Sequence, residues 1–231
     1  MLAVRSIFRW IPGFLVFGLG APLLVVITFL PPEIMRFKAA TLFCRAIVWS
    51  LGGHIQVEGK FPTDRNYIFM ANHGSMLDVF ILVAALRGKF TAIIAHESLR
   101  YFLFGTLVKR YRVIPIKRKN LESALESIKI AEQRFADHYN VVILPEGTRT
   151  LTGELGPLKK GGFHMAINTK APINVIRING AFEMKPKTSW HLRPRPINVH
   201  FGKVIEPDRY DELGIEGVMD EVRSEFVRLA E

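Results

Sequence analysis

Two side chains that could act together as a general base and its orienting acid, His73 and Asp78, stand five positions apart in the segment 72–78. On one continuous helix they would point about 140° apart, because each helical residue turns about 100°. They can meet if a helix begins between them, where Gly74 permits a turn and Ser75 is suited to the N-cap. A neighbouring carboxylate fixes the imidazole tautomer and favours its protonated form, as a general base requires. The alternative is an exposed histidine on a turn, followed by an ordinary aspartate in a first helical turn.

A second polar loop, 145–149, directly follows the apolar run 141–144. Gly147 permits a tight turn, Arg149 offers a planar fork for a phosphate, and Glu146 can anchor that arginine or a neighbouring amide. A structural turn with a surface ion pair is equally compatible with this loop taken alone.

Two lysines, Lys159 and Lys160, precede the glycine pair at positions 161–162. A helix that starts there would present free backbone N–H groups beside two positive side chains, a combination that can bind an anion. A solvated basic helix start is the alternative. The late basic group at positions 185, 187, 193 and 195 is interpreted as a solvated loop.

Short apolar runs alternate with helical patterns after Gly53, which predicts a mostly parallel central sheet flanked by helices. In such sheets, functional loops follow the carboxyl ends of the strands. Strands are predicted at 54–58, 67–71, 91–95, 113–116, 141–144, 172–178 and 197–201, and helices at 79–86, 120–137, 159–169 and 216–229.

The N-terminal segment 11–30 carries no charged residue and has the length of a bilayer-spanning helix. Positive residues stand on both sides of it, which suits a helical hairpin in one leaflet with both flanks at the cytoplasmic surface. The second arm is expected at 33–51. A spanning helix and a buried core hairpin are the alternatives. The chain is therefore divided into a membrane-associated hairpin, 1–52, and an α/β catalytic domain, 53–231.

Charge and composition restrict the class of partner. The chain of 231 residues has a net charge of +10, 49% hydrophobic residues and one cysteine. This balance favours an anionic membrane surface, and the basic residues interleaved with aromatics between positions 100 and 119 suit lipid headgroups. No nucleic-acid, nucleotide-binding or serine-hydrolase motif is present. The single cysteine excludes an internal disulfide framework.

These segments resemble, in their order and spacing, the glycerolipid acyltransferase family, most closely bacterial 1-acylglycerol-3-phosphate acyltransferases. The similarity covers about residues 54–205. The similar blocks are 72–78 (N-H-x4-D), 113–118 (the block whose arginine binds glycerol phosphate), 145–149 (E-G-T-R), 158–163 (F-K-K-G-x-F) and the start of a fourth block at 172–173.

The resemblance implies acyl transfer from acyl-CoA or acyl carrier protein to the sn-2 hydroxyl of lysophosphatidate, giving phosphatidate for phospholipid synthesis. It implies that His73 is the base and that Asp78 orients it, with no metal or bound cofactor. The partners it implies are lysophosphatidate, the acyl donor and anionic membrane lipids, and no nucleic acid. The expected location is the inner membrane, with the catalytic domain on the cytoplasmic side. The implied substrate-binding residues are Arg118, Glu146, Gly147, Thr148, Arg149, Lys159 and Lys160.

The chain also departs from the family pattern. Arg112 stands where the family usually has glycine, Lys117 where it has an acidic residue, and His96 where a lysine is common. In the fourth block, Asn174 and Val175 replace an apolar residue and a proline. Acyl transfer to another lysolipid, such as one with a larger headgroup or a lyso-aminolipid, is therefore the alternative reaction. A non-catalytic, basic membrane-binding protein is the alternative of a different class.

Overall fold

The structure, a computed structural model, describes residues 2–31, 33–117 and 120–230. Its strands are β1 (Gly53–Glu58), β2 (Ile68–Ala71), β3 (Phe90–Ala95), β4 (Ile114–Ile116), β5 (Asn140–Ile143), β6 (Ile173–Asn179) and β7 (Arg195–Ile205). They form one sheet in the order β1-β7-β6-β2-β5-β3-β4, and every neighbouring pair is parallel except β6 and β7. The predicted, mostly parallel α/β fold is confirmed.

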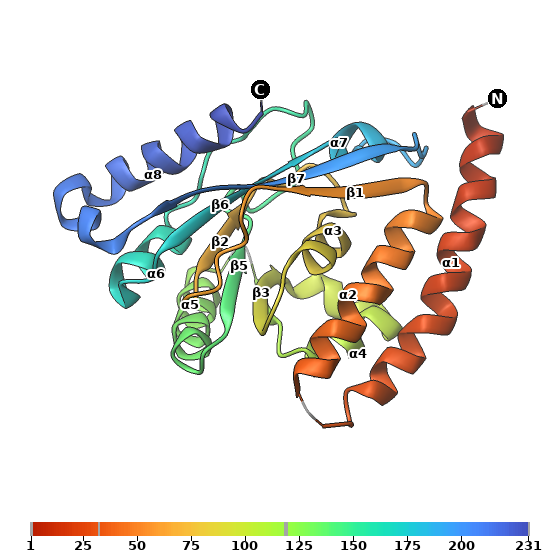
Figure 1. Ribbon diagram of the computed structural model, residues 1–231, viewed down its shortest axis with the longest axis horizontal. Helices are drawn as coiled ribbons and strands as arrows, with labels where there is room; N and C mark the ends of the chain where they lie inside the picture. The colour runs from red at the N-terminus through yellow and green to blue at the C-terminus, as the bar shows by residue number, and fades with distance from the viewer. Residues whose placement is uncertain (1, 32, 118–119, 231) are drawn as a thin grey trace.

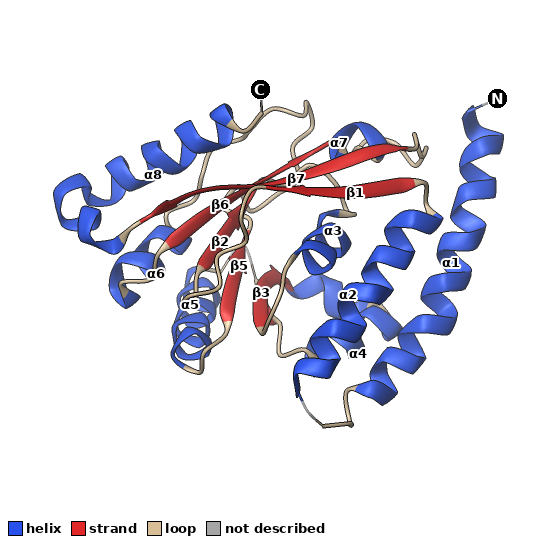
Figure 2. Ribbon diagram, in the orientation of Figure 1, coloured by secondary structure: helices blue, strands red, loops and turns tan. Residues whose placement is uncertain are grey.

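Helices cover the sheet on both faces, in two separate groups (Figures 1 and 2). One face carries α1 (Leu2–Ile27), α2 (Glu33–Ser50), α3 (Asp78–Ala85) and α4 (Phe102–Arg110). The other carries α5 (Leu121–Ala136), α6 (Gly161–Thr169) and α8 (Tyr210–Arg228). Shorter helices are η1 (His96–Arg100), α7 (Ala181–Met184) and η2 (Pro207–Arg209).

Strand β2 lies in the middle of the sheet and contributes to both cores. Phe69 and Ala71 belong to the core on the α2 and α3 side, whereas Ile68 and Met70 belong to the core under α5, α6 and α8. All four side chains are fully buried. A continuous apolar run is typical of a parallel strand covered on both faces. This strand fixes the position of the loop that carries His73.

Four helices are not predicted from the sequence: η1, α4, α7 and η2. Helix α4 lies within the basic and aromatic stretch 100–119, and η1 ends where that stretch begins. Helices α7 and η2 are single turns, too short for a periodic pattern. The last helix, α8, starts at Tyr210, six residues before the predicted start at 216. It bends at Gly214, where φ is 59° and ψ is −179°. The predicted start at residue 216 corresponds to the part after this bend.

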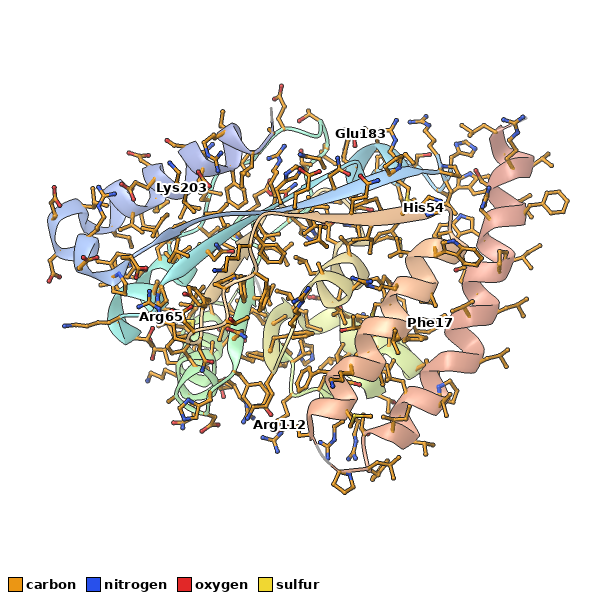
Figure 3. The ribbon with its side chains drawn as sticks, in the orientation of Figure 1. Phe17, His54, Arg65, Arg112, Glu183 and Lys203 are labelled. Atoms are coloured by element: carbon orange, nitrogen blue, oxygen red, sulfur yellow. The ribbon has the colours of Figure 1, made fainter. Side chains whose placement is uncertain are left out.

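Among the described residues, α1 is the one helix long and apolar enough to cross a membrane. Its outward side chains include Leu19, Phe8 and Phe14, which are 77%, 69% and 68% exposed. Its inner side packs on the other helices, and the ring of Phe17 lies 6.0 Å from that of Phe43 in α2 (Figure 3).

Helix α2 differs from α1 because one of its sides belongs to the main core. Phe37, Ile47 and Val48 are buried against neighbours that include residues of α3. The backbone carbonyl of Ala84 in α3 accepts a hydrogen bond from Arg45 Nε at 3.1 Å. Helix α2 is therefore buried on one side, as the alternative of a core hairpin expects, whereas the outer side of α1 is exposed and does not fit that alternative.

The turn after α4 contains Arg112, one of the departures from the family pattern. Arg112, which is labelled in Figure 3, has a φ of 56°, in the left-handed region. Its N–H donates to the carbonyl of Lys109 at 3.1 Å, and the N–H of Val113 donates to that of Val108 at 2.9 Å. These two bonds form a Schellman motif, in which the left-handed position favours glycine. Arginine can occupy it only at a cost in backbone strain.

We expect Arg112→Gly to raise the free energy of unfolding by about 0.5–1 kcal/mol, since relief of a strain of about 1–2 kcal/mol exceeds the entropy that glycine adds to the unfolded chain. Thermal unfolding in detergent should show a rise in Tm of a few degrees. The matched control is Lys109→Gly inside α4, which should lower stability by about 1 kcal/mol. A fall in Tm for both variants would contradict this explanation.

Candidate active site

The loop 72–78 joins the end of β2 to the start of α3, and the structure brings His73 and Asp78 together there. His73 Nδ1 lies 2.8 Å from Asp78 Oδ2. The Asp78 side chain is 1% exposed and that of His73 is 17% exposed. Since the helix begins at Asp78, the two side chains need not share a helical face. The acid is shielded from solvent, whereas the ring remains accessible.

The same carboxylate oxygen also holds the backbone of the loop. Asp78 Oδ2 accepts hydrogen bonds from the N–H groups of Gly74 at 2.8 Å and Ser75 at 2.9 Å. A charged carboxylate accepts Nδ1–H from the ring, which leaves Nε2 of the neutral imidazole as the proton acceptor.

Ser75 caps the start of the helix, as the sequence predicts. Its hydroxyl oxygen accepts the N–H of Leu77 at 3.2 Å, and Asp78 Oδ2 accepts the N–H of Ser75 at 2.9 Å, the reciprocal bonds of an S-x-x-D cap. The α-helix starts at Asp78, but Leu77 before it already has a helical φ of −78° and ψ of −13°. The Ser75 hydroxyl also donates to the carbonyl of Lys185 at 2.8 Å.

Glu146 is a brace for the backbone around His73. Its Oε1 accepts the N–H of His73 at 2.7 Å, and its Oε2 accepts the N–H of Gly156 at 2.8 Å. The N–H of Thr150 donates to the carbonyl of His73 at 2.9 Å. The sequence left open whether Glu146 binds an arginine or a backbone amide. In the structure it binds backbone amides. The residue is 5% exposed, so these bonds are shielded from water.

The turn at Gly147 brings Lys159 over the loop. Gly147 has a φ of 67°, and a Cβ atom there would lie 2.9 Å from Lys159 Cε and 3.0 Å from its Nζ. Glycine is therefore needed both for the backbone conformation and for the close approach of the lysine. Lys160, the next residue, forms an ion pair with Glu216 of α8. Lys159 thus lies over the loop at Gly147, whereas Lys160 points to α8.

The other predicted site residues take different positions. Thr148 is exposed and Arg149 is half-buried on the same loop. Arg118 lies outside the described residues. The site therefore contains His73, Asp78, the loop 145–149 and Lys159.

Two residues of the site have roles that sequence reasoning missed. Asn72 pairs with the backbone of β6, since its Oδ1 accepts the N–H of Ile178 at 2.7 Å and its Nδ2 donates to the same residue's carbonyl at 3.0 Å. Lys185, predicted in a solvated loop, is 6% exposed. That prediction was wrong, because Lys185 directly follows α7 and its carbonyl is bound to Ser75 of the loop 72–78. Its apolar neighbours Met184 and Pro186 were the one local signal of burial.

Comparisons with known proteins agree with this geometry. A family model described as Acyltransferase matches residues 54–179. The 1-acyl-sn-glycerol-3-phosphate acyltransferase of Cocos nucifera is 31% identical over 209 residues, which cover 88% of this chain and 68% of that protein. The protein of the same name from Limnanthes douglasii is 28% identical, with 87% and 72% covered. The crystal structure of the 1-acyl-sn-glycerophosphate acyltransferase PlsC from Thermotoga maritima superposes with a TM-score of 0.84 at 18% identity, covering 99% of this chain and 97% of that one.

We expect Glu146→Ala to lower the free energy of unfolding by about 2–4 kcal/mol, since it leaves two shielded N–H groups without their acceptor. Thermal and urea unfolding in detergent would measure the change. Glu154→Ala, an exposed glutamate of the same loop, is the control and should change stability by less than about 0.5 kcal/mol. Equal losses in the two variants would contradict the bracing role.

Proposed function

This chain belongs to the acyltransferase family, and we propose that it transfers a fatty acyl group from a thioester to the sn-2 hydroxyl of lysophosphatidate. The product is phosphatidate. The observation that carries the proposal is the hydrogen bond of 2.8 Å between His73 Nδ1 and the buried Asp78. This pair leaves Nε2 available to remove a proton from a hydroxyl group.

In the proposed reaction, Nε2 of His73 takes the hydroxyl proton while the oxygen attacks the thioester carbon. The carbon–sulfur bond then breaks, and the imidazolium returns its proton to the thiolate. Asp78 stabilises the imidazolium formed between these steps. A backbone N–H of the loop would stabilise the oxyanion. Because the thioester is already activated, no acyl-enzyme, metal or bound cofactor is required, and the donor is acyl-CoA or acyl carrier protein.

The substrate phosphate is proposed to bind at the loop 145–149. Arg149 supplies a guanidinium group there, and the closeness of Lys159 to Gly147 supports including this lysine. Thr148 is an exposed hydroxyl donor on the same loop. The ion pair of Lys160 with Glu216 argues for a supporting position of that lysine rather than direct contact. Arg118 is retained on the strength of the family resemblance.

His73→Ala should lower kcat by about 10²- to 10⁴-fold, the usual contribution of a general base. Asp78→Asn should also lower kcat strongly, because an amide cannot stabilise the imidazolium. The assay follows release of free thiol from acyl-CoA in the presence of lysophosphatidate and detergent. His164→Ala in α6 removes an exposed histidine and should leave turnover unchanged. Unchanged turnover in His73→Ala would reject the mechanism.

We further propose that the segment 1–52 binds the membrane and that 53–231 carries the catalysis. The exposed apolar side of α1 and the net charge of +10 support this division. Both ends of the hairpin would lie at the cytoplasmic surface of the inner membrane, where anionic lipids attract the basic protein. Such a position brings the active site to the surface that contains the lysolipid and the product.

The double variant Phe14→Glu/Leu19→Glu should weaken binding to anionic vesicles at least tenfold. Each apolar side chain contributes about 1.5–3 kcal/mol when it is removed from water. Vesicle flotation with full-length protein measures the bound fraction. Leu125→Glu/Val227→Glu changes two exposed apolar residues of α5 and α8 and serves as the control. Equal flotation of both double variants would show that α1 is not the membrane-binding element.

A further inference from the structure

Lys185 is a buried cation without a carboxylate partner. It is 6% exposed, and its Nζ donates one hydrogen bond, to the carbonyl of Pro186 at 3.1 Å. It makes no ion pair with any described carboxylate. An ammonium group has three donors and is costly to bury unpaired. Burial lowers the pKa of Lys185, and the nearby Arg149 lowers it further.

The backbone around Lys185 is fixed to the catalytic loop. Its carbonyl accepts the Ser75 hydroxyl, two residues from His73. Phe182 of α7 packs between the two loops: a Cβ atom on Gly74 would lie 3.1 Å from Phe182 Cβ, and one on Gly153 would lie 2.9 Å from its Cδ1. Lys185 therefore stands at the boundary between the loop of His73 and the loop that follows Arg149.

Arg149 is a second cation that lacks compensation at this boundary. It makes no ion pair with a described carboxylate. Glu146 of the same loop binds two backbone N–H groups with its oxygens and makes no ion pair with Arg149. Arg177 in β6 is different, since its Nε donates a hydrogen bond to Asn179 Oδ1 at 3.1 Å. Lys185 and Arg149 are thus two cations beside the loop of His73 that have no carboxylate partner among the described residues.

We propose that Lys185 and Arg149 form a subsite for the dianionic phosphate monoester of the lysolipid acceptor, and that Lys185 selects this headgroup. The inference rests on the proposed function and narrows its substrate class. A phosphate monoester carries nearly two negative charges near neutral pH, with several acceptor oxygens. It can compensate both cations at once. A phosphodiester headgroup carries one negative charge and leaves either the buried Lys185 or the half-buried Arg149 uncompensated, which disfavours its binding.

Kinetics of Lys185→Met in detergent test this assignment. The KM for lysophosphatidate should rise at least tenfold, while kcat and the KM for the acyl donor stay within about twofold, as expected for loss of an interaction that ground state and transition state share. The preference for lysophosphatidate over lysophosphatidylglycerol, a phosphodiester, should fall at least tenfold. Lys187→Met, at an exposed position of the same loop, should match the wild type.

Thermal unfolding separates binding from folding. The Tm of Lys185→Met should equal or exceed that of the wild type, because the substitution removes an unpaired buried charge. If this variant does not fold, Lys185→Gln retains a donor for the carbonyl of Pro186 and allows the same kinetic comparison.

The other outcomes would overturn the inference in distinguishable ways. Wild-type turnover on lysophosphatidate with an unchanged KM in the variant would reject the role of Lys185 and retain the proposed function. A rise confined to the KM of the acyl donor would assign the subsite to the donor's phosphates instead. Absence of wild-type turnover on lysophosphatidate, with turnover on another lysolipid, would reject the proposed acceptor itself.

Discussion

A single oxygen atom, Oδ2 of Asp78, accepts hydrogen bonds from the ring of His73 and from the backbone N–H groups of Gly74 and Ser75. These three bonds fix the path of the loop and the orientation of the imidazole together. The other carboxylate oxygen, Oδ1, is buried without a hydrogen-bond partner among the described residues. The charge of Asp78 is therefore compensated best when the imidazole is protonated. The interaction strengthens as His73 accepts a proton, which is the property that the proposed mechanism requires of it.

The order of strands, rather than local sequence, brings the remaining parts of the site to this pair. Strand β2 lies between β6 and β5 and runs parallel to both, so the loops after these three strands leave the same edge of the sheet. The loop after β5 supplies Glu146, which holds the backbone of His73 from 73 positions away. The segment after β6 supplies the carbonyl of Lys185, which holds Ser75 from 110 positions away.

The fold and the central pair could be predicted because each depends on local patterns. Buried apolar runs mark the strands, and a turn between His73 and Asp78 is enough to make them meet. The sequence could not show that Lys159 and Lys160 contact different parts of the molecule. Lys159 lies over the loop at Gly147 and Lys160 pairs with Glu216 of α8, and both contacts depend on the tertiary fold. The burial of Lys185 also escaped prediction, because it depends on which strand neighbours β2, and one sequence does not specify that order.

Helix α1 is connected to the active site by the ten residues from 185 to 194. The carbonyl of Lys185, at one end of this loop, accepts the hydroxyl of Ser75 beside His73 and Asp78. Near the other end, the buried N–H of Leu192 donates to the Ser6 hydroxyl of α1 at 3.0 Å. If α1 were detached from the catalytic domain, the N–H of Leu192 would lose its acceptor, at a cost of about 1–3 kcal/mol. Helix α1 therefore supports the loop of the active site on its inner side while it presents apolar side chains on its outer side, so membrane association and the geometry around Ser75 depend on the same helix.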